Sequence, residues 1–181
     1  MSYQTVPYDA FLRQTLARLD DPGLFLVSQG QEGRPNAMAI GWGTIGIIWG
    51  KPMFLVLVRP SRYTYALLEQ SDSFTVCVPA PSQYDALQYC GTHSGRDEDK
   101  LAVCGLQTVP SLRVRTPGLA GTPLIYECRI VHHNDIQPAE LQEGIIQEYY
   151  PQDNYHRVYF GEILAVRALP EAEALIAPAE R

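Results

Sequence analysis

Residues 36–64, NAMAIGWGTIGIIWGKPMFLVLVRPSRYT, decide the fold of this chain. Residues 36–48 mix β-branched, aromatic and small side chains, which predicts a strand, and residues 50–52 (Gly-Lys-Pro) predict a turn. Residues 53–58 are entirely apolar and predict a buried strand. Glycine is costly inside a plain strand, so the glycines within residues 41–46 indicate a bulge, a bend or the close approach of a ligand.

The rest of the chain repeats this pattern of short strands divided by turns. Four further strands are predicted at residues 24–28, 74–78, 124–132 and 156–167. Helices are predicted at residues 8–19, 63–70, 84–89 and 143–150, residues 91–99 form a loop, and the tail from residue 170 is expected to fray. Many short strands with few short helices favour an antiparallel barrel or sandwich. No G-x-G-x-x-G segment follows a strand, which argues against a Rossmann-type fold.

Composition limits the class of protein. The 181 residues carry 46% hydrophobic and 19% charged residues, as in an ordinary globular protein, so we expect a single domain over residues 1–181 with its core at about 24–167. The net charge of -6 argues against a nucleic-acid partner or an anionic membrane surface. No apolar run is long enough to cross a bilayer and residues 1–7 do not resemble a signal peptide, so we expect a cytoplasmic protein. The four cysteines form no CxxC pair and are expected to be buried thiols.

The segment Arg59-Pro-Ser-Arg-Tyr-Thr64 gathers cations and hydroxyl groups at the expected start of a helix. Such groups, together with the free N–H groups of a helix N-terminus, are what a phosphate requires. The alternative is a helix cap, in which Ser61 or Thr64 satisfies the first turn and the arginines are solvated. The preceding strand favours the phosphate, because it offers a place for the rest of a ligand.

Residues 36–44 show two different faces if they form one regular strand. One face carries Asn36, Met38, Ile40, Trp42 and Thr44, because side chains alternate along a strand. The opposite face consists of alanine and glycine. A flat ring could lie against the backbone of this bare face, or the face could pack against a neighbouring sheet. A ring surface followed by a phosphate segment suggests a phosphorylated aromatic cofactor.

The remaining polar clusters are weaker signals. Residues 93–100 form either a solvated charged loop or an anion-binding loop, with N–H groups around Gly95 and the charge of Lys100. His132 and His133 point to opposite faces of a strand and are poor joint metal ligands, so no metal site is expected. No set of residues resembles a nucleophile–base–acid relay, so a cofactor would have to carry out the chemical step of any reaction.

Four segments in the same order resemble the flavin reductase-like, FMN-binding split-barrel family, and within it the flavoredoxin-like branch. They are Asn36-Ala-Met-Ala-Ile-Gly-Trp42, Arg59-Pro-Ser-Arg-Tyr-Thr64, Cys90-Gly-Thr-His-Ser-Gly-Arg-Asp-Glu-Asp-Lys100 and His156-Arg-Val-Tyr-Phe-Gly161-Glu-Ile. The resemblance implies a mainly β, six-stranded antiparallel Greek-key split barrel that forms a homodimer and binds FMN. Where the family's closing motif often carries Gly-Asp before its histidine, this chain has Asn154-Tyr155, which leaves a catalytic role for His156 open.

The resemblance also implies positions for the cofactor. The flavin ring and ribityl chain would lie along one strand, with cofactor-binding residues Asn36, Met38, Ala39, Trp42 and Thr44. The phosphate would be held by Arg59, Ser61, Arg62, Tyr63 and Thr64. Ser94, Gly95 and Lys100 would close the site, and His156 would be the catalytic residue near the reacting edge of the ring. Residues 138–153 are longer than the shorter reductases need, and could cover the ring or shape a substrate pocket.

Three functions remain open from the sequence. The first is an oxidoreductase of the flavin reductase type, which passes hydride from NAD(P)H to flavin and electrons to an acceptor. The second is a flavoredoxin-like electron carrier without nicotinamide turnover. The third is a ligand-binding barrel without redox chemistry.

Overall fold

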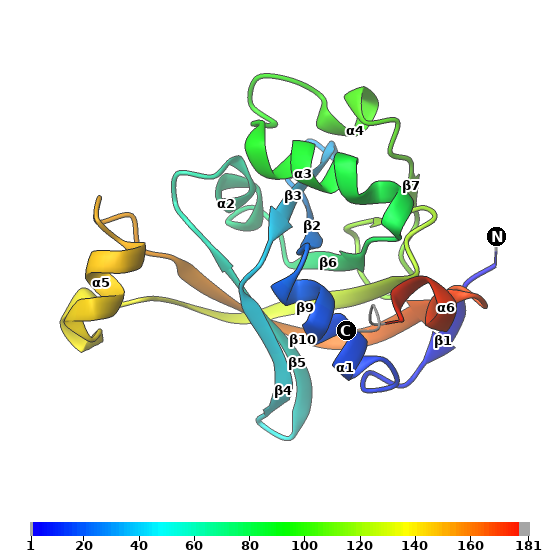
Figure 1. Cartoon of the computed structure of the whole chain (residues 1–181), viewed down its shortest axis with the longest axis horizontal. Helices are drawn as coiled ribbons and strands as arrows, with labels where there is room; N and C mark the ends of the chain where they lie inside the picture. The colour runs from blue at the N-terminus through cyan, green and yellow to red at the C-terminus, as the bar shows by residue number, and fades with distance from the viewer. Residues whose placement is uncertain (1, 178–181) are drawn as a thin grey trace.

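The computed structural model describes residues 2–177, which form a curved antiparallel sheet with helices around it (Figure 1). The main sheet has the strand order β3-β2-β6-β9-β10-β5-β4, and β1 pairs with β10. Its strands are β1 (Gln4–Val6), β2 (Leu24–Gln29), β3 (Pro35–Ile40), β4 (Gly43–Ile48), β5 (Lys51–Val58), β6 (Ser73–Val78), β9 (Leu124–Asp135) and β10 (Arg157–Ala168). A second, two-stranded sheet pairs β7 (Thr108–Val109) with β8 (Gly118–Leu119).

Short helices connect and cover these strands. They are α1 (Leu12–Asp20), α2 (Tyr63–Leu68), α3 (Tyr84–Thr92), α4 (Lys100–Val103), α5 (Glu143–Tyr149) and α6 (Ala172–Ile176), with 3-10 turns at Pro81–Gln83 and Pro138–Glu140. None of the helices within residues 2–177 is long and apolar enough to span a membrane. The four predicted helices are confirmed as α1, α2, α3 and α5. The short elements β1, β7, β8, α4 and α6 were not predicted, because so few residues carry little periodicity.

The sheet closes into a split barrel because of how its edge strands are connected. β3 and β4 lie at opposite ends of the strand order, yet only Gly41 and Trp42 separate them in the chain. Two residues cannot cross a flat sheet of this width, since neighbouring strands are about 4.8 Å apart. The sheet therefore curls until its two edges meet at residues 41–42. The predicted antiparallel barrel is confirmed.

The prediction of one continuous strand over residues 36–48 is wrong. β3 pairs with β2, whereas β4 pairs with β5 on the other edge of the sheet. The chain changes partner at Gly41, so Trp42 and Thr44 do not continue the side-chain alternation of β3. Gly43 is required by close packing, because a Cβ atom there would lie 2.6 Å from the carbonyl oxygen of Leu55.

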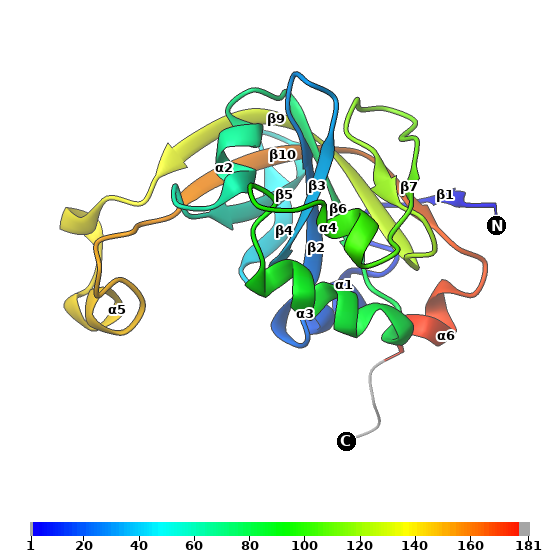
Figure 2. The same cartoon turned by 90° about the horizontal axis from the view of Figure 1, so that it is seen from above.

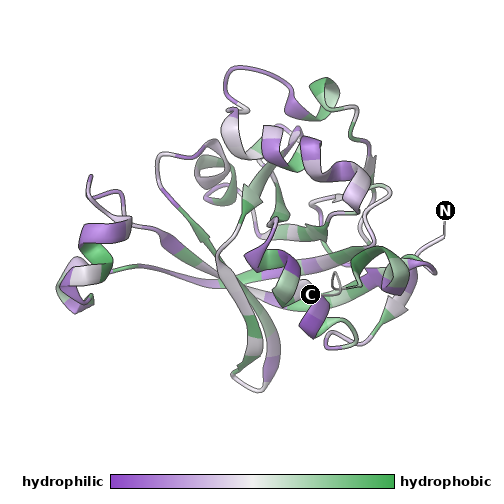
Figure 3. Ribbon diagram, viewed as in Figure 1, coloured by the Kyte–Doolittle hydropathy of each residue, from purple (hydrophilic) through white to green (hydrophobic). Residues whose placement is uncertain are grey.

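Two hydrophobic clusters stabilise the barrel. The first fills its interior with buried residues including Leu24, Leu26, Phe54, Val56, Phe74 and Tyr126. α1 packs against this cluster, and the Thr15 and Tyr126 hydroxyl groups lie 2.8 Å apart. The second cluster lies between the outer face of the sheet and the helices α3 and α4, and includes Phe25, Val27, Ala37, Leu87, Cys90 and Ile125. Figure 3 shows hydrophobic residues concentrated along the central strands, and hydrophilic residues along the loop between α3 and α4.

β9 shows the side-chain alternation of a strand with one partly wet face. Tyr126 and Cys128 face the barrel interior, and Ile125 belongs to the outer cluster. Arg129 and Val131 on the outer face are exposed, whereas Glu127 on the same face is fully buried. Its carboxylate lies 2.7 Å from the Arg167 guanidinium and accepts hydrogen bonds from the backbone N–H groups of residues 112 and 113. The buried ion pair therefore anchors the loop before β8.

The tail beyond residue 170 is more ordered than expected. Pro170 precedes the helix α6, in which Ala172 and Ile176 are buried against the barrel core. A short helix with two buried apolar residues does not fray. The final part of the predicted tail, residues 178–181, lies outside the described residues.

One segment leaves the body of the barrel. Residues 136–156 connect the end of β9 to the start of β10 and contain α5; we call this segment the excursion. Figure 2 shows α5 well to one side of the sheet. The hairpin of β4 and β5 extends in a different direction, below the barrel in Figure 1, where α5 lies at the left. The excursion returns to the barrel at the point where β5 ends and α2 begins, because β10 pairs with β5 from Arg157 to Val58.

Candidate functional site

A cavity lies between β3, the start of α2 and the loop that follows α3. It has a volume of about 370 Å³, within the usual range for small-molecule sites. The predicted residues on its wall are Asn36, Met38, Ala39, Ser61, Arg62, Tyr63, Thr64, Ser94, Gly95 and Lys100. Three segments that are far apart in the sequence thus form one pocket, which we call the first cavity.

The hydroxyl groups of Ser61 and Thr64 do not cap α2, so the helix-cap alternative is wrong. The N-cap residue is Arg62, and no side-chain hydrogen bond caps this helix. The Thr64 hydroxyl accepts a hydrogen bond of 2.9 Å from the Asn36 amide, and the Ser61 hydroxyl accepts one of 2.8 Å from the Asn154 amide. Because both oxygens accept, both O–H groups remain able to donate to an anionic ligand.

The loop after α3 is held over the first cavity by defined contacts. Lys100 is buried, and its ammonium group donates to the carbonyl oxygens of Cys90 (2.9 Å) and His93 (3.1 Å). Burial lowers the pKa of Lys100. A Cβ atom at Gly95 would clash with the Asn36 amide oxygen and would lie 2.9 Å from the Tyr63 ring, so a larger residue here must displace these side chains or the loop.

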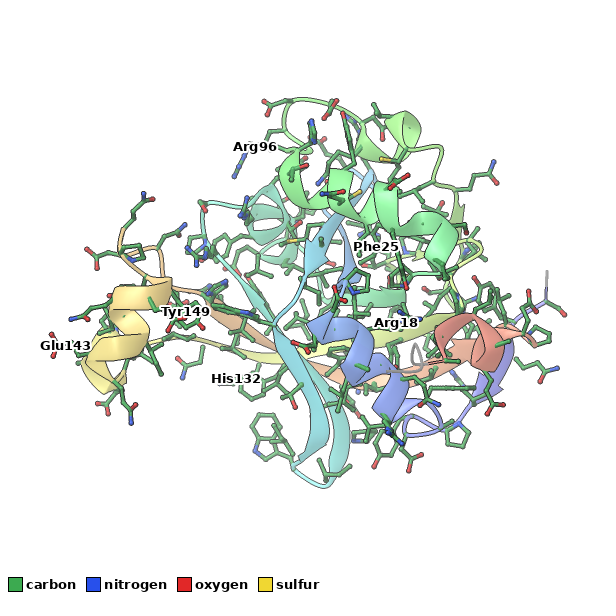
Figure 4. All side chains as sticks on the ribbon, in the orientation of Figure 1. Arg18, Phe25, Arg96, His132, Glu143 and Tyr149 are labelled. Atoms are coloured by element: carbon green, nitrogen blue, oxygen red, sulfur yellow. The ribbon has the colours of Figure 1, made fainter. Side chains whose placement is uncertain are left out.

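Arg96 is a residue of this loop that the sequence analysis did not select. Its guanidinium donates to the Ser61 carbonyl oxygen at 3.0 Å and lies over the ring of Tyr63. Arg96 therefore connects the loop to the start of α2. In Figure 4 it lies at the top of the molecule, on the loop between α3 and α4.

A second cavity of about 230 Å³ adjoins the first and shares Met38, Ala39 and Arg62 with it. Its other lining residues are Ile40, Gly41, Trp42, Leu57, Arg59 and His156. Arg59 was expected beside the phosphate with Ser61, but it lines only this second cavity. The Trp42 ring lies 5.0 Å from that of His156, between ring centroids. This cavity is thus aromatic and cationic, whereas the first is rich in hydroxyl, amide and N–H groups.

His156 is bound through both ring nitrogens. Its Nδ1 atom lies 2.9 Å from the Tyr150 hydroxyl, and its Nε2 atom lies 3.4 Å from Nε of Arg59. Burial, together with the positive charges of Arg59 and Arg62, lowers the pKa of His156 to about 4. The imidazole is therefore neutral near pH 7, and it is a poor proton donor there.

The excursion contacts both cavities. Arg59 donates to the Tyr149 carbonyl oxygen at 2.9 Å, and its guanidinium lies over the ring of Tyr150. Asn154 donates to Ser61, as described above. Figure 4 shows Tyr149 on the side of α5 nearer the barrel and Glu143 at its far side. Residues 149–154 therefore contribute to the site, and no local motif identified them, because their partners are about 90 residues away in the chain.

Two residues or surfaces of the segment 36–44 are not where a ligand along one strand would place them. Thr44 is exposed on β4 and lines neither cavity. The bare face of β3 packs mainly against α3 rather than against a sheet: Ala37 is fully buried, and a Cβ atom at Gly91 would lie 3.1 Å from that of Ala39. Ala39 nevertheless reaches both cavities, since β3 is an edge strand.

Comparison with known proteins identifies the family. The model of the flavin reductase like domain matches residues 18–177. The chain belongs to this family. An uncharacterized protein of Archaeoglobus fulgidus is 28% identical over 142 residues, which are 78% of this chain and 70% of that protein. Membership of the flavin reductase like domain family supports a flavin-related redox function.

Solved structures of the family share the fold. The flavoredoxin of Desulfovibrio vulgaris is 26% identical, with a TM-score of 0.66 over 83% of this chain and 70% of its own. An FMN-binding domain of a flavin reductases-like enzyme from Shewanella baltica is 22% identical, with a TM-score of 0.65 over 92% and 77% of the two chains. The predicted split-barrel fold is confirmed, and at the level of the family the expected flavin cofactor is confirmed as well.

The donor set of the first cavity fits a phosphate-bearing cofactor. Two hydroxyl groups already accept hydrogen bonds and can donate outward, and the Arg62 guanidinium lies beside them. Charged and hydroxyl donors are the groups that recognise phosphate oxygens. The aromatic second cavity adjoins this set, which suits a ligand with a phosphate at one end and a flat ring at the other.

Proposed function

We propose that the protein binds FMN and acts as an oxidoreductase of the flavin reductase type, with NAD(P)H as the hydride donor. The observation that carries the proposal is the pair of adjoining cavities, one built from phosphate-binding groups and the other from aromatic and cationic groups. The chemistry supplied by bound FMN is acceptance of a hydride at its N5 atom and transfer of electrons to an acceptor.

In this proposal the residues divide between the two ends of the cofactor. Arg62 and the hydroxyl groups of Ser61 and Thr64 bind the phosphate, and Tyr63 packs beside them. Asn36, Met38 and Ala39 line the path from the phosphate to the ring. Ser94, Gly95 and Lys100 keep the loop after α3 closed over the first cavity. Each assignment follows the lining of the first cavity.

The second cavity is proposed to hold the flavin ring, which is the reacting end of FMN. Trp42 and His156 supply flat surfaces, and Arg59 supplies positive charge. Positive charge beside a flavin ring stabilises its reduced, anionic form and so raises its reduction potential. His156 acts here as a neutral wall rather than as a proton donor, in keeping with its lowered pKa of about 4.

The test is a titration of the purified protein with FMN, followed by anaerobic addition of NADH and of NADPH. We expect a bound-flavin absorbance band at about 450 nm that bleaches within seconds of adding one of the two nicotinamides. Absence of any bound flavin after adding FMN would reject the proposal. Comparing the two nicotinamides also gives the coenzyme preference.

A flavoredoxin-like electron carrier is the second candidate, supported by the likeness to the flavoredoxin of Desulfovibrio vulgaris. A carrier would bind FMN equally well, but its flavin would exchange electrons with a redox partner and would not react directly with nicotinamide. Bound flavin that stays oxidised with both nicotinamides, yet bleaches with dithionite, would favour this candidate over the first.

The proposal includes a homodimer in the cytoplasm. Ile47 and Trp49 of the β4–β5 hairpin are 58% and 64% exposed, and a large exposed apolar surface is typical of an interaction site. Three of the four cysteines are buried free thiols, as expected in a reducing compartment. Light scattering of wild type and of Trp49→Glu tests the dimer: a wild-type mass of one chain would contradict it.

A further inference from the structure

Tyr150 is a buried residue in an otherwise exposed segment. It follows α5 directly and is only 3% exposed, whereas Tyr149 before it is 40% exposed. Its ring stacks on that of Tyr155 with 4.8 Å between centroids, and its hydroxyl reaches Nδ1 of His156 at 2.9 Å. The excursion thus places the Tyr150 hydroxyl at Nδ1 of the imidazole, whereas Arg59 contacts the other ring nitrogen, Nε2.

The hydrogen bonds determine which ring nitrogen carries the proton. A guanidinium can only donate, so Nε2 of His156 must accept the hydrogen bond from Arg59. The proton of the neutral ring is then on Nδ1, and the Tyr150 oxygen accepts it. Of these two contacts, the one to Tyr150 is shorter by 0.5 Å (2.9 against 3.4 Å). Tyr150 is therefore the stronger restraint on the ring.

The charges that face His156 favour the same neutral state. Arg59, from the end of β5, and Arg62, from the start of α2, are both cations, and Tyr150 is the titratable group on the remaining side. A protonated imidazole would add a third positive charge to a buried site that holds two already. Arg59 and Arg62 are thus the positive charges of the second cavity, and the imidazole is an uncharged, flat part of its wall.

We propose that Tyr150 is a positioning residue, whose hydroxyl accepts the Nδ1–H proton that the Arg59 contact places there and so holds the ring plane of His156 against the second cavity. Its hydroxyl carries this role, and the ring supplies packing on Tyr155. The effect on turnover rests on the proposed function, because it requires a ring-bearing ligand in the second cavity. The effect on the imidazole itself does not.

The first arm of the test uses ligand-free protein labelled with ¹⁵N at histidine. The wild type is expected to show the nitrogen shifts of the Nδ1–H tautomer for His156, with no titration between pH 5.5 and 8 (at least about 1 unit above the lowered pKa). In Tyr150→Phe the contact to Arg59 still requires the Nδ1–H tautomer, but the Nδ1–H proton has lost its acceptor, so this proton is expected to exchange with water at least about 10-fold faster. The matched control is Tyr155→Phe, which removes a hydroxyl from the same excursion that contacts Asp153 and not His156.

The outcome of this arm decides the proposal. Faster exchange of the His156 Nδ1–H proton in Tyr150→Phe but not in Tyr155→Phe supports it. An unchanged exchange rate in Tyr150→Phe overturns it, provided that circular dichroism shows the variant to be folded. Should the variant fail to fold, rapid exchange of the Nδ1–H proton in the wild type would overturn the proposal, since a buried hydrogen-bonded proton exchanges slowly.

The second arm uses the FMN-loaded protein and separates binding from turnover. Tyr150→Phe is expected to lower kcat with NAD(P)H by about 10-fold, which corresponds to about 1.4 kcal/mol, while the FMN Kd changes less than 2-fold. Equal kcat in wild type and variant, alongside faster exchange of the Nδ1–H proton, would overturn the effect on turnover. Absence of turnover in the wild type would instead be a failure of the proposed function, and the first arm would still decide the role of Tyr150.

Discussion

Replacing Arg62 with alanine tests the phosphate site most directly. Arg62 lies at the N-cap of α2, and it lines both cavities. Within residues 2–177 no ion pair involves its guanidinium. The replacement therefore removes a charge without breaking an ion pair of the folded protein, so any effect on ligand binding reflects the ligand.

The size of the effect follows from the kind of contact. A hydrogen bond between charged partners contributes about 1.5–3 kcal/mol, and exposure to solvent places a contact in the lower part of that range. Arg62 is exposed, so we expect a loss of about 1.5–2 kcal/mol. Since 1.4 kcal/mol is a factor of ten in Kd, Arg62→Ala should weaken FMN binding by about 10- to 30-fold.

The assay compares two ligands that differ only in the phosphate. FMN and riboflavin are titrated into wild type and Arg62→Ala by flavin fluorescence, at low and high salt. Arg62→Ala should weaken FMN binding, whereas its riboflavin Kd should stay within about 2-fold of the wild-type value. Added salt should reduce the difference in FMN affinity between the two proteins, because salt screens exposed charges. Arg13→Ala is the control, since Arg13 is an exposed cation on α1.

Two results would refute the reasoning. Equal losses for FMN and riboflavin would mean that Arg62 supports the ring or the fold rather than the phosphate. A loss of less than 2-fold for FMN, with the Arg62→Ala protein folded as judged by circular dichroism, would mean that the phosphate lies elsewhere.

Three further predictions address the loop, the histidine and the buried ion pair. Gly95→Ala should weaken FMN binding at least 10-fold while the melting temperature falls by only a few degrees, because a Cβ atom there clashes with Asn36 and must move the loop; unchanged affinity by the same titration would contradict this. The pKa of His156 is lowered to about 4 from an unfolded value of 6.5, so the unfolded chain binds more protons between these pH values. The contribution of His156 to stability is therefore complete above about pH 6.5 and is lost as pH falls toward 4. Urea unfolding of the wild type should show a loss of about 3 kcal/mol over this range, and a similar loss in His156→Gln would show that other groups cause it. Arg167→Met leaves the Glu127 carboxylate buried without its cation and should lower the free energy of unfolding by about 3–5 kcal/mol; a loss below 1 kcal/mol in urea unfolding would show that the pair does not anchor the loop before β8.

Much of the site was predictable because its signals are local in the sequence. Hydroxyl and guanidinium groups follow one another at Ser61, Arg62 and Thr64, so a single short segment indicates an anion site. The alternation of β9 and the breaks at glycine and proline likewise depend on neighbouring residues. The number and length of such strands favoured an antiparallel barrel or sandwich, and the resemblance to the flavin reductase-like family favoured the split barrel.

The division of the site into two cavities was not predictable in this way. Arg59 and Ser61 are two residues apart, yet Arg59 lines one cavity and Ser61 the other, because the chain turns between them at the end of β5. The break of residues 36–48 into β3 and β4 was not predictable either. No residue type within this segment indicates that its two halves pair with strands on opposite edges of the sheet.

The sequence by itself determined the antiparallel β class, the order of the strands and the gathering of cations and hydroxyl groups at residues 59–64, since each depends on residue types within a short window. Only the tertiary structure decided that Asn154 orients the Ser61 hydroxyl across 93 positions and that Arg59 faces His156 across 97. Such contacts depend on the register of β10 beside β5, and that register is set by packing of the whole sheet.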